Sequence, residues 1–553
     1  MISGSWASGV QRLASAVATT RWLLPSACVT LALLPQAFKL TLPPHEQFSG
    51  FFPDDAFYYY KTALRSYEGG VIPSFDGVNA TTGFHPLWML VAIALAGLTR
   101  DPGAYLSLML ATNLLFVGLF SMVLWRGLRR SLGWVLATAV ICTLNWSNSY
   151  ATAIFTGLET PLSLLFAWLA IERTVRVDYD DAAGLRGLGA VAGLAFLART
   201  DFVLCLPLLA GVLWVRHRGA SAERHLVAGT VAALPFAALT LPYLAWNLWL
   251  TGMIQPISGA IKSSGLMGAR LSAAKELAVY GDWALRNGLL GQLAPVIVVL
   301  AIGVPLSATS WRLRRRWSLL DDPRALLWCG FAAMVTLYYA VAYGRTGGDW
   351  HLAPLAVAWS IVVAHALADL SRLRWGAPVV AIAVLASLAA YSGDAMRHRA
   401  EYLETNYHFV APVFYQHEVS RWMADHLPPS ATVGVFDAGY IAYFAGCRVV
   451  NLDGLINGRE LYDYYRDGRG VIRYVIDKRL DYLSNYYFGD PSPERSPIAP
   501  YLERVFQVGP REVNLEGRPV TVDWYVWRVH RERIPPGLVE SGVFDGVPPL
   551  RSR

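Results

Sequence analysis

The sequence predicts a multi-span α-helical membrane protein that ends in a small α/β domain. Three observations lead to this fold class. Of the 553 residues, 54% are hydrophobic and only 16% are charged, whereas soluble domains carry about 25% charged residues. Apolar runs of about twenty residues or somewhat fewer recur up to residue 392, and runs of this length can cross a bilayer. Beyond residue 392, short apolar runs alternate with helical patterns, as in α/β domains.

The composition also narrows the class of function. Aromatic residues make up 12% of the chain, with 20 Trp and 27 Tyr, and such rings anchor proteins at membrane interfaces. The net charge of +7 comes mostly from arginines in short loops between apolar runs, so it does not indicate a nucleic-acid partner. The preference for Arg over Lys is typical of a GC-rich bacterial genome. The spacing of the cysteines predicts neither a disulfide framework nor a zinc site: Cys28, Cys142, Cys205, Cys329 and Cys447.

About eleven segments are predicted to cross the membrane, with the N-terminus inside and the C-terminus outside. They are residues 22–40, 104–125, 132–150, 160–174, 185–198, 202–215, 226–248, 292–309, 324–343, 353–370 and 376–392. Every strongly basic short loop, such as Arg126–Arg130, then faces the cytoplasm, as the positive-inside rule requires. The apolar run 86–98 is too short to cross and is interpreted as a juxtamembrane or re-entrant helix. The segment after Arg21 lacks a cleavage signal, so we expect it to remain as an anchor.

The chain is therefore predicted to have two parts. Residues 1–392 form a transmembrane domain, in which residues 41–103 make the first outer loop with juxtamembrane helices. Residues 393–553 form an α/β domain on the outer face. Its predicted strands and helix are Thr432–Phe436, Arg448–Leu452, Val520–Val526 and Val413–His426.

Two polar stretches follow the first two predicted strands of the C-terminal domain. They are Phe436-Asp437-Ala438-Gly439-Tyr440 and Asn451-Leu452-Asp453-Gly454-Leu455-Ile456-Asn457. Ligands bind beyond the carboxyl ends of strands in open α/β sheets. One interpretation is that these residues only shape turns. The other is that the domain covers an active site and selects the acceptor.

The first outer loop contains the most distinctive stretch, Phe51–Lys61. Pro53 suits the first turn of a helix, where Asp54 and Asp55 match the positive end of the helix dipole. At helical spacing Asp54, Tyr58 and Lys61 share one face. Two acids, a cation and aromatic rings beside a bilayer can hold a polar substrate and remove a proton from it. The alternative is an ordinary helix start with dipole-matching acids.

The predicted topology gathers further ionisable residues on the outer side. The cations are Lys61, Arg199, Lys262 and Arg345, the acids are Asp54, Glu159, Asp201 and Asp349, and His85 lies in the same loops. Ionisable groups at membrane depth are costly and usually functional. Cations can hold a phosphate and a carboxylate can act as general base, so this set predicts a site for a phosphorylated lipid and a second substrate that loses a proton. Each member also has a structural interpretation: Glu159 and Asp201 as helix caps, Arg199–Asp201 as an ion pair, and His85 as the end of a turn.

Four motifs in this part of the chain resemble those of the GT-C superfamily of membrane glycosyltransferases. They are Asp54-Asp55-Ala56-Phe57-Tyr58-Tyr59, Thr82-Gly83-Phe84-His85-Pro86-Leu87-Trp88, Thr156-Gly157-Leu158-Glu159-Thr160 and Ala198-Arg199-Thr200-Asp201, and Gly347-Gly348-Asp349 and Lys262 add to the likeness. The sequence is most similar to bacterial enzymes that use polyprenyl-phosphate sugars, including mycobacterial arabinofuranosyltransferases and lipid A aminoarabinose transferases. The resemblance spans most of residues 40–355. At Gly348-Asp349-Trp350-His351 the sequence departs from the arabinosyl relatives after the Asp.

The resemblance implies an inverting glycosyltransferase at the outer face of a bacterial plasma membrane. It would move a sugar from a polyprenyl-phosphate donor to a hydroxyl of a glycan, lipid or protein. The implied catalytic residues are Asp54 as general base, Asp55 beside it and Glu159 as the second outer-loop acid. Lys61, Arg199, Lys262, Arg345 and His351 would stabilise the phosphate charge, and Tyr58, His85, Asp201 and Asp349 would support the site. No cofactor is expected to be required; a divalent metal, if one is used, would bind Asp54, Glu159 and His351.

Two other classes of function are compatible with parts of this pattern. A transporter or lipid flippase would use intramembrane charges, but transporters usually show inverted repeats with a midplane site, and the sequence shows neither. A non-catalytic scaffold for envelope assembly would use the C-terminal domain for binding, but it leaves the Asp54-Asp55 pair unexplained.

Overall fold

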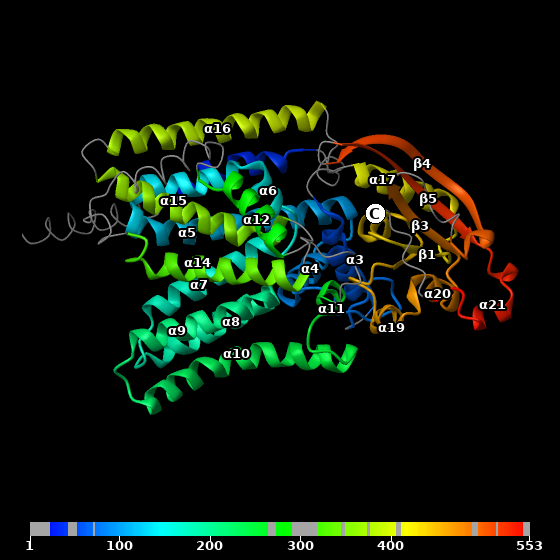
Figure 1. Ribbon diagram of the computed structural model, residues 1–553, viewed down its shortest axis with the longest axis horizontal. Helices are drawn as coiled ribbons and strands as arrows, with labels where there is room; N and C mark the ends of the chain where they lie inside the picture. Colours follow the sequence, from blue (N-terminus) through cyan, green and yellow to red (C-terminus); the bar gives the residue numbers. More distant parts are fainter. Residues whose placement is uncertain are drawn as a thin grey trace, which may run out of the picture.

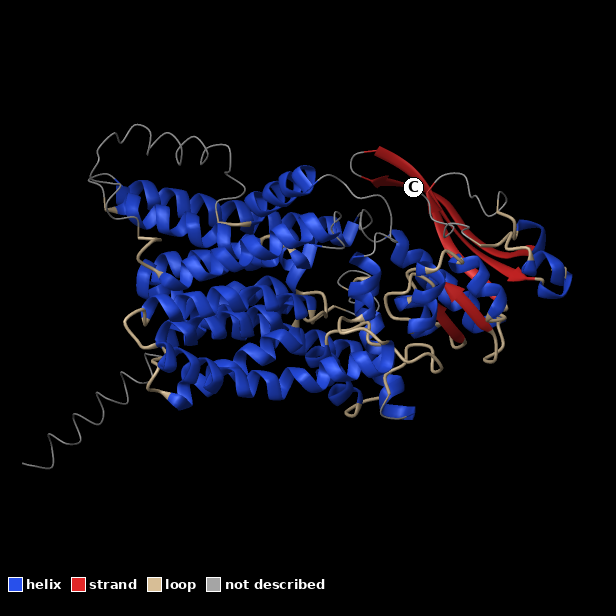
Figure 2. Ribbon diagram, turned by 60° about the horizontal axis from the view of Figure 1, so that its bottom comes forward, coloured by secondary structure: helices blue, strands red, loops and turns tan. Residues whose placement is uncertain are grey.

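The computed structural model describes residues 23–42, 52–69, 72–263, 273–289, 318–343, 349–372, 376–404, 411–488, 496–515 and 518–545. Figure 1 shows helices of the first part lying side by side along the long axis, with the C-terminal sheet at one end of them. The second view agrees, with the strands gathered beyond the end of the helical part (Figure 2). The molecule therefore has a helical part and a sheet-containing part joined end to end.

The helical part contains long apolar helices and several shorter ones near the sheet. In chain order they are Leu23–Lys39, α3 (Asp54–Gly69), α4 (Pro86–Ala96), α5 (Pro102–Trp146), α6 (Asn148–Ile154), α7 (Thr160–Arg176), α8 (Ala182–Ala198), α9 (Leu206–Arg216), α10 (Ala222–Thr251), α11 (Ile257–Ser263), α12 (Ala273–Asn287), α14 (Pro323–Tyr338), α15 (Ala353–Ser371) and α16 (Gly376–Glu404). Two short segments are 3₁₀ helices, η1 (Thr200–Cys205) and η5 (Asp349–His351), and η4 (Tyr339–Tyr343) is a single π-helical turn. Helix α8 packs against both α7 and α10.

The element labelled α5 is a helical hairpin rather than one straight rod. Gly133 has φ 78° and ψ 171°, a left-handed backbone that glycine adopts without strain. Asn145 donates a hydrogen bond of 3.2 Å to the Ser121 hydroxyl, although 24 residues of straight helix would separate them by about 36 Å. The chain therefore turns back at Gly133, which confirms the two antiparallel segments predicted on either side of Arg126–Arg130.

Four helices within the described residues are long and apolar enough to cross a membrane. They are Pro102–Trp146, Ala222–Thr251, Pro323–Val341 and Ala353–Ser371, and shorter apolar helices occur at Leu23–Lys39, Pro86–Ala96, Ala182–Ala198 and Ala377–Gly393. These positions match predicted segments, and residues 86–96 form the short helix expected there. The predicted segment 292–309 lies outside the described residues. The count of eleven spans and the orientation of the chain stay predictions.

The C-terminal part is built on a five-stranded sheet, which confirms its predicted α/β character. The strands are β1 (Thr432–Val435), β2 (Arg448–Asn451), β3 (Tyr482–Phe488), β4 (Leu502–Leu515) and β5 (Arg518–Val529). They lie in the order β2-β1-β3-β5-β4; β1 is parallel to β2 and β3, whereas β5 is antiparallel to β3 and β4. The accompanying helices are α17 (Ala411–His426), α18 (Gly439–Phe444), α19 (Arg459–Arg466), α20 (Gly470–Asp477) and α21 (Pro536–Glu540). The three strands expected from sequence are β1, β2 and part of β5.

Both faces of this sheet are buried, and one face joins the core of the helical part. Along β5, Trp524 and Val526 belong to the large core shared with the helices, whereas Tyr525 and Trp527 belong to a separate core with α19 and α20. This alternation follows from the two-residue period of a strand. Helix α16 continues past residue 393 as far as Glu404, and the predicted domain boundary at residue 393 stays a prediction.

Candidate functional site

Helix α3 lies where the helical part meets the C-terminal sheet. Its Phe57 ring packs against Tyr440 and Tyr443 of α18, with ring centroids 5.0 and 5.6 Å apart. Gly439, the first residue of α18, is required at this contact, because a Cβ there would lie 2.1 Å from the Asp54 carbonyl oxygen. The start of α3 thus lies directly against α18, the helix that follows β1.

The Asp54 carboxylate is occupied by the C-terminal part. It accepts hydrogen bonds from the backbone N–H groups of Gly439 and Tyr440, both at 2.8 Å, and from the Gln416 side chain at 3.0 Å. Asp54 therefore accepts hydrogen bonds from N–H groups at the start of α18 that have no partner within that helix. Burial and the nearby Asp437 nevertheless raise the pKa of Asp54 well above its ordinary value. Both oxygens of the sequence-predicted base are engaged in joining the two parts of the chain.

Asp55, the next residue, has a different environment. Within the described residues no hydrogen bond or ion pair engages the side chain of Asp55 or that of Lys262 on α11. Burial raises the pKa of Asp55 to about 6; the charge of Lys262 acts in the opposite direction, and those of Asp453, Asp437 and Glu159 add to the rise. Asp55 is thus a partly buried carboxylate with a raised pKa and with no hydrogen-bond donor among the described residues.

Asp453 reaches α3 from the loop after β2. It accepts a hydrogen bond of 2.7 Å from the Tyr58 hydroxyl, which in turn accepts one of 3.1 Å from Asn451. All three side chains are buried. The sequence singled out Tyr58 as a supporting residue and left Asp437 and Asp453 open between turn-forming and ligand-binding roles. What pointed to Asp437 and Asp453 in the sequence was their position, because each follows the carboxyl end of a parallel strand, where ligands bind.

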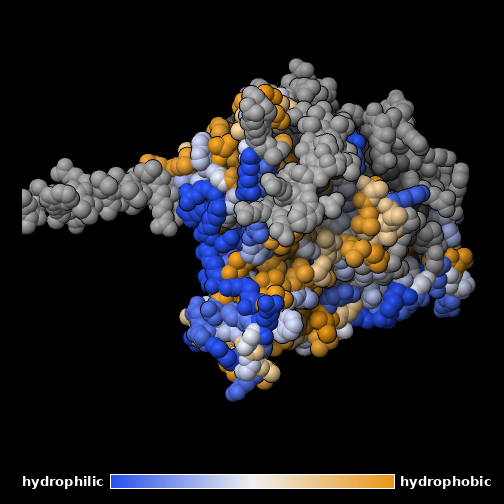
Figure 3. Space-filling view, turned by 60° about the vertical axis from the view of Figure 1, so that its left-hand side comes forward, coloured by the Kyte–Doolittle hydropathy of each residue, from blue (hydrophilic) through white to orange (hydrophobic). Residues whose placement is uncertain are grey.

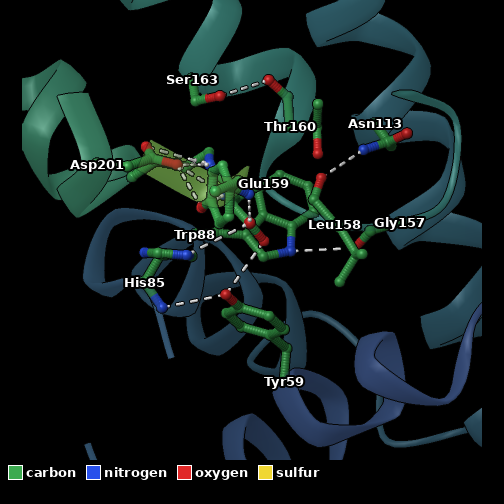
Figure 4. Close-up of polar contacts among 12 residues, drawn as sticks. Tyr59, His85, Trp88, Asn113, Gly157, Leu158, Glu159, Thr160, Ser163 and Asp201 are labelled. Atoms are coloured by element: carbon green, nitrogen blue, oxygen red, sulfur yellow. Dashed lines mark hydrogen bonds and ion pairs between the residues drawn. The ribbon is translucent and has the colours of Figure 1, made fainter. Parts of the chain in front are cut away.

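A second polar cluster surrounds Glu159 at the start of α7. Arg199 donates to Glu159 at 2.7 Å and to Asp201 at 2.8 Å. The Tyr339 hydroxyl accepts from Arg199 at 2.9 Å and donates to Asp201 at 2.8 Å. Figure 4 shows Tyr59 and His85 reaching Glu159 from separate elements, with Asp201 on the other side of the cluster. The Arg199–Asp201 ion pair that the sequence allowed is present, and Arg199 is committed to protein carboxylates.

His85 and Tyr59 connect this cluster to α3. The Tyr59 hydroxyl donates to Glu159 at 3.1 Å and accepts from the backbone N–H of His85 at 3.0 Å, and His85 Nε2 lies 3.5 Å from Glu159 Oε1. Burial lowers the pKa of His85, against the opposing effect of Glu159, and the charge of Lys262 contributes to the lowering. The charge of Lys262 therefore lowers the pKa of both Asp55 and His85.

A cavity with about 350 Å³ of empty space, partly open to solvent, borders the cluster. Its polar lining includes Arg199, Asp201, His351, Thr160 and Ser163. The His351 ring lies 4.4 Å from that of Tyr339. The hydroxyl of Thr160 is buried and without a hydrogen-bond partner among the described residues. His351 thus lies beside the Arg199 cluster, and its predicted role in phosphate binding stays a prediction. Tyr339 was not anticipated because it lies in a plain run of aromatic and apolar residues.

The remaining predicted residues fall elsewhere. Lys61 lies further along α3, where its charge acts on Cys447 of the C-terminal part. Arg345 lies outside the described residues, and only the backbone of Asp349 is described.

Among the side chains that the structure describes, no three His, Cys, Asp or Glu are placed to hold a metal ion. In this structure Asp54 is engaged by α18 and Glu159 by Arg199, and a divalent metal at Asp54, Glu159 and His351 stays a prediction.

Comparison with known families finds a match in the C-terminal part. Residues 401–526 match a family model described as Domain of unknown function (DUF8728). This range runs from the end of α16 into β5 and includes both Asp437 and Asp453. Among curated proteins, none matches the chain.

Comparison with solved structures identifies the fold of nearly the whole chain. ArnT from Cupriavidus metallidurans, in a crystal structure bound to undecaprenyl phosphate, is 13% identical with a TM-score of 0.50, and the match covers 90% of this chain and 97% of ArnT. The oligosaccharyltransferase of Archaeoglobus fulgidus, in a complex with zinc and sulfate, is 12% identical with a TM-score of 0.50, covering 84% of this chain and 67% of that one. Both are GT-C enzymes. The likeness to GT-C membrane glycosyltransferases is confirmed, and the chain has their fold.

Proposed function

We propose that the protein is a membrane glycosyltransferase that transfers a sugar, with inversion, from a polyprenyl-phosphate donor to a hydroxyl acceptor. One observation carries the proposal. Asp55 and Lys262, two opposite charges without hydrogen-bond partners among the described residues, act on each other where the helical part meets the C-terminal sheet. Enzymes place a base of near-neutral pKa and a free cation in such surroundings. The shared fold with ArnT, which binds undecaprenyl phosphate, supports the donor class.

In this proposal Asp55 is the general base in place of Asp54. A base needs an oxygen free to accept the acceptor's proton, and both Asp54 oxygens already accept hydrogen bonds. As the acceptor oxygen attacks the anomeric carbon, its proton passes to Asp55 while the bond from that carbon to the phosphate oxygen breaks. Attack from the side opposite the leaving group inverts the anomeric configuration. Lys262 stabilises the charge on the departing phosphate, and no step needs a metal ion.

Asp437 is proposed to contact the acceptor, and Asp453, whose two oxygens already accept from the Tyr58 hydroxyl and the Leu455 N–H, is proposed to hold the loop beside it. Carboxylates accept hydrogen bonds from sugar hydroxyls, and both acids act electrostatically on Asp55. Asp437 has a left-handed backbone with φ 47°, an uncommon conformation that is enriched at functional sites. The C-terminal part would then complete the site and select the acceptor from the membrane's outer side.

The test compares Asp54→Asn with Asp55→Asn in the full-length membrane protein. General bases contribute about 10²- to 10⁴-fold to rate, so D55N is expected to lose sugar transfer by that factor while D54N loses less. Transfer is followed with a radiolabelled polyprenyl-phosphate sugar and envelope extracts as acceptor. If D54N loses sugar transfer while D55N keeps near-normal turnover, Asp54 and not Asp55 is the general base. Lipid translocation without sugar transfer by the unmodified protein would indicate a flippase and would contradict the proposal.

A further inference from the structure

A second pocket lies at the end of the helical part that is opposite the C-terminal sheet. We call it the arginine pocket; it is lined by Pro25, Val123, Trp125, Arg126, Gly127, Arg129, Arg130, Trp168, Leu169, Glu172 and Arg176, and it contains about 880 Å³ of empty space, part of it open to solvent. Glu172 is thirteen residues beyond Glu159, which is about 20 Å along α7. The arginine pocket is therefore separate from the site proposed for sugar transfer.

Positive charge is in excess in the arginine pocket. Four arginines line it and Glu172 is its one acidic lining residue. Glu172 already accepts hydrogen bonds from three guanidinium groups, those of Arg130 at 2.6 Å, Arg324 at 2.6 Å and Arg176. The lining therefore carries a net positive charge, and Arg129, Arg130 and Arg176 present theirs at the solvent-exposed side of the pocket, where an anion can approach them. The pocket thus has the charge of an anion site.

The lining also offers an unused hydrogen-bond donor and apolar surface. The indole N–H of Trp168 is buried and has no hydrogen-bond partner among the described residues. The Arg129 guanidinium lies over the Trp125 ring, 5.1 Å from its centroid. Val123, Leu169 and Pro25 supply aliphatic surface beside these groups. In Figure 3, which turns this end of the molecule toward the viewer, hydrophilic residues gather in a band beside hydrophobic ones.

We propose that the arginine pocket binds the phosphate of an anionic bilayer phospholipid in the leaflet at this end of the protein. Arginine recognises phosphate with paired hydrogen bonds, and basic pockets between membrane helices are suited to anionic head groups. The Trp168 N–H donates to a phosphate oxygen, while the aliphatic residues contact the acyl chains. A soluble phosphate would use the same arginines but would gain nothing from that apolar surface.

The test measures lipid binding to the purified full-length protein in detergent by native mass spectrometry, with phosphatidylglycerol and phosphatidylcholine as probes. Each basic contact near a membrane surface contributes roughly fivefold in affinity. Arg129→Gln with Arg130→Gln is therefore expected to weaken phosphatidylglycerol binding about 30-fold, and Trp168→Phe to weaken it less. Phosphatidylcholine should bind weakly to every form.

The matched control is Arg186→Gln with Arg218→Gln, which removes two positive charges from exposed positions that do not line the pocket. We expect this control to bind phosphatidylglycerol like the unmodified protein. Equal losses in the control and pocket variants would reduce the effect to general surface charge and overturn the proposal. Equal binding of the two lipids would also overturn it, as would displacement of phosphatidylglycerol by millimolar inorganic phosphate, which would assign the pocket to a soluble anion.

Discussion

The two charged clusters next to α3 are built from similar residues but differ in how those residues are partnered. Around Arg199, two carboxylates and a tyrosine hydroxyl use the guanidinium N–H groups, so the cation is fully paired within the cluster. Around Lys262, Asp55 keeps its oxygens free while Asp437, Asp453 and Glu159 add negative charge nearby. The first arrangement is a closed ion-pair network, whereas the second retains unmet binding capacity.

This difference changes the role expected of each cluster. A buried ion pair that is complete contributes shape and positions its neighbours, and the Arg199 network does so for His85 and Tyr59. A carboxylate with a near-neutral pKa and no hydrogen-bond donor is suited to proton transfer. A count of ionisable residues in a sequence does not distinguish a paired cluster from an unpaired one, because it contains no information on hydrogen-bond partners.

The largest expected effect is the loss of the closed network. Arg199→Met leaves Glu159 and Asp201 as buried carboxylates without a cation, which costs about 3–5 kcal/mol of folding free energy. We expect a clear fall in the thermal unfolding midpoint of the protein in detergent. Arg186→Met, at an exposed position on α8, serves as control. An R199M protein as stable as the control would show that the network does not hold the fold.

The next largest effect is expected at the contact between α3 and α18, where the two parts of the chain meet. Gly439→Ala places a methyl group 2.1 Å from the Asp54 carbonyl oxygen, and overpacking of this kind costs about 1–3 kcal/mol. We expect faster amide hydrogen exchange in α3 and α18 together with reduced sugar transfer. Gly537→Ala is the control, since its added methyl group meets open space. Unchanged exchange in G439A would contradict the close contact of α3 with α18.

A smaller effect tests the link between α3 and the loop after β2. Tyr58→Phe removes the hydroxyl that donates to Asp453 and accepts from Asn451, at a cost of about 1.5 kcal/mol for a hydrogen bond to a charged group. We expect a higher KM for the acceptor and little change in KM for the donor. Tyr67→Phe, at an exposed position near the end of α3, is the control. Equal changes in both KM values would argue against a role of Asp453 on the acceptor side.

The smallest effect is a shift in the pH dependence of transfer. Asp55 has a pKa of about 6 and acts as a base only when ionised, so activity should rise as the pH increases through about 6. The positive charge of Lys262 lowers this pKa, so Lys262→Met should move the acidic limb of the kcat/KM profile to higher pH by less than about one unit. Lys275→Met removes the same charge from an exposed position on α12 and should leave the limb in place. If the acidic limb of the K262M profile stays in place, the charge of Lys262 does not act on the catalytic base.

The sequence alone determined the class of fold and much of its local order. Low charge content and repeated apolar runs predict membrane helices, since hydrophobic length and charge act locally along the chain. The paired segments around Arg126–Arg130 and the helix beginning at Asp54 follow from the same local rules. The strands at β1 and β2, each followed by an Asp, were also visible in the sequence.

Only the tertiary structure decided which of these charges are free. Asp54 and Asp55 are adjacent, yet one is bonded to α18, nearly 400 residues away in sequence, and the other is not. Arg199 was predicted to bind phosphate, and its ion pair with Glu159 depends on how α7 and α8 pack. The physical reason is that a hydrogen bond requires a donor and an acceptor about 3 Å apart, and distances between remote segments are fixed by packing rather than by local sequence.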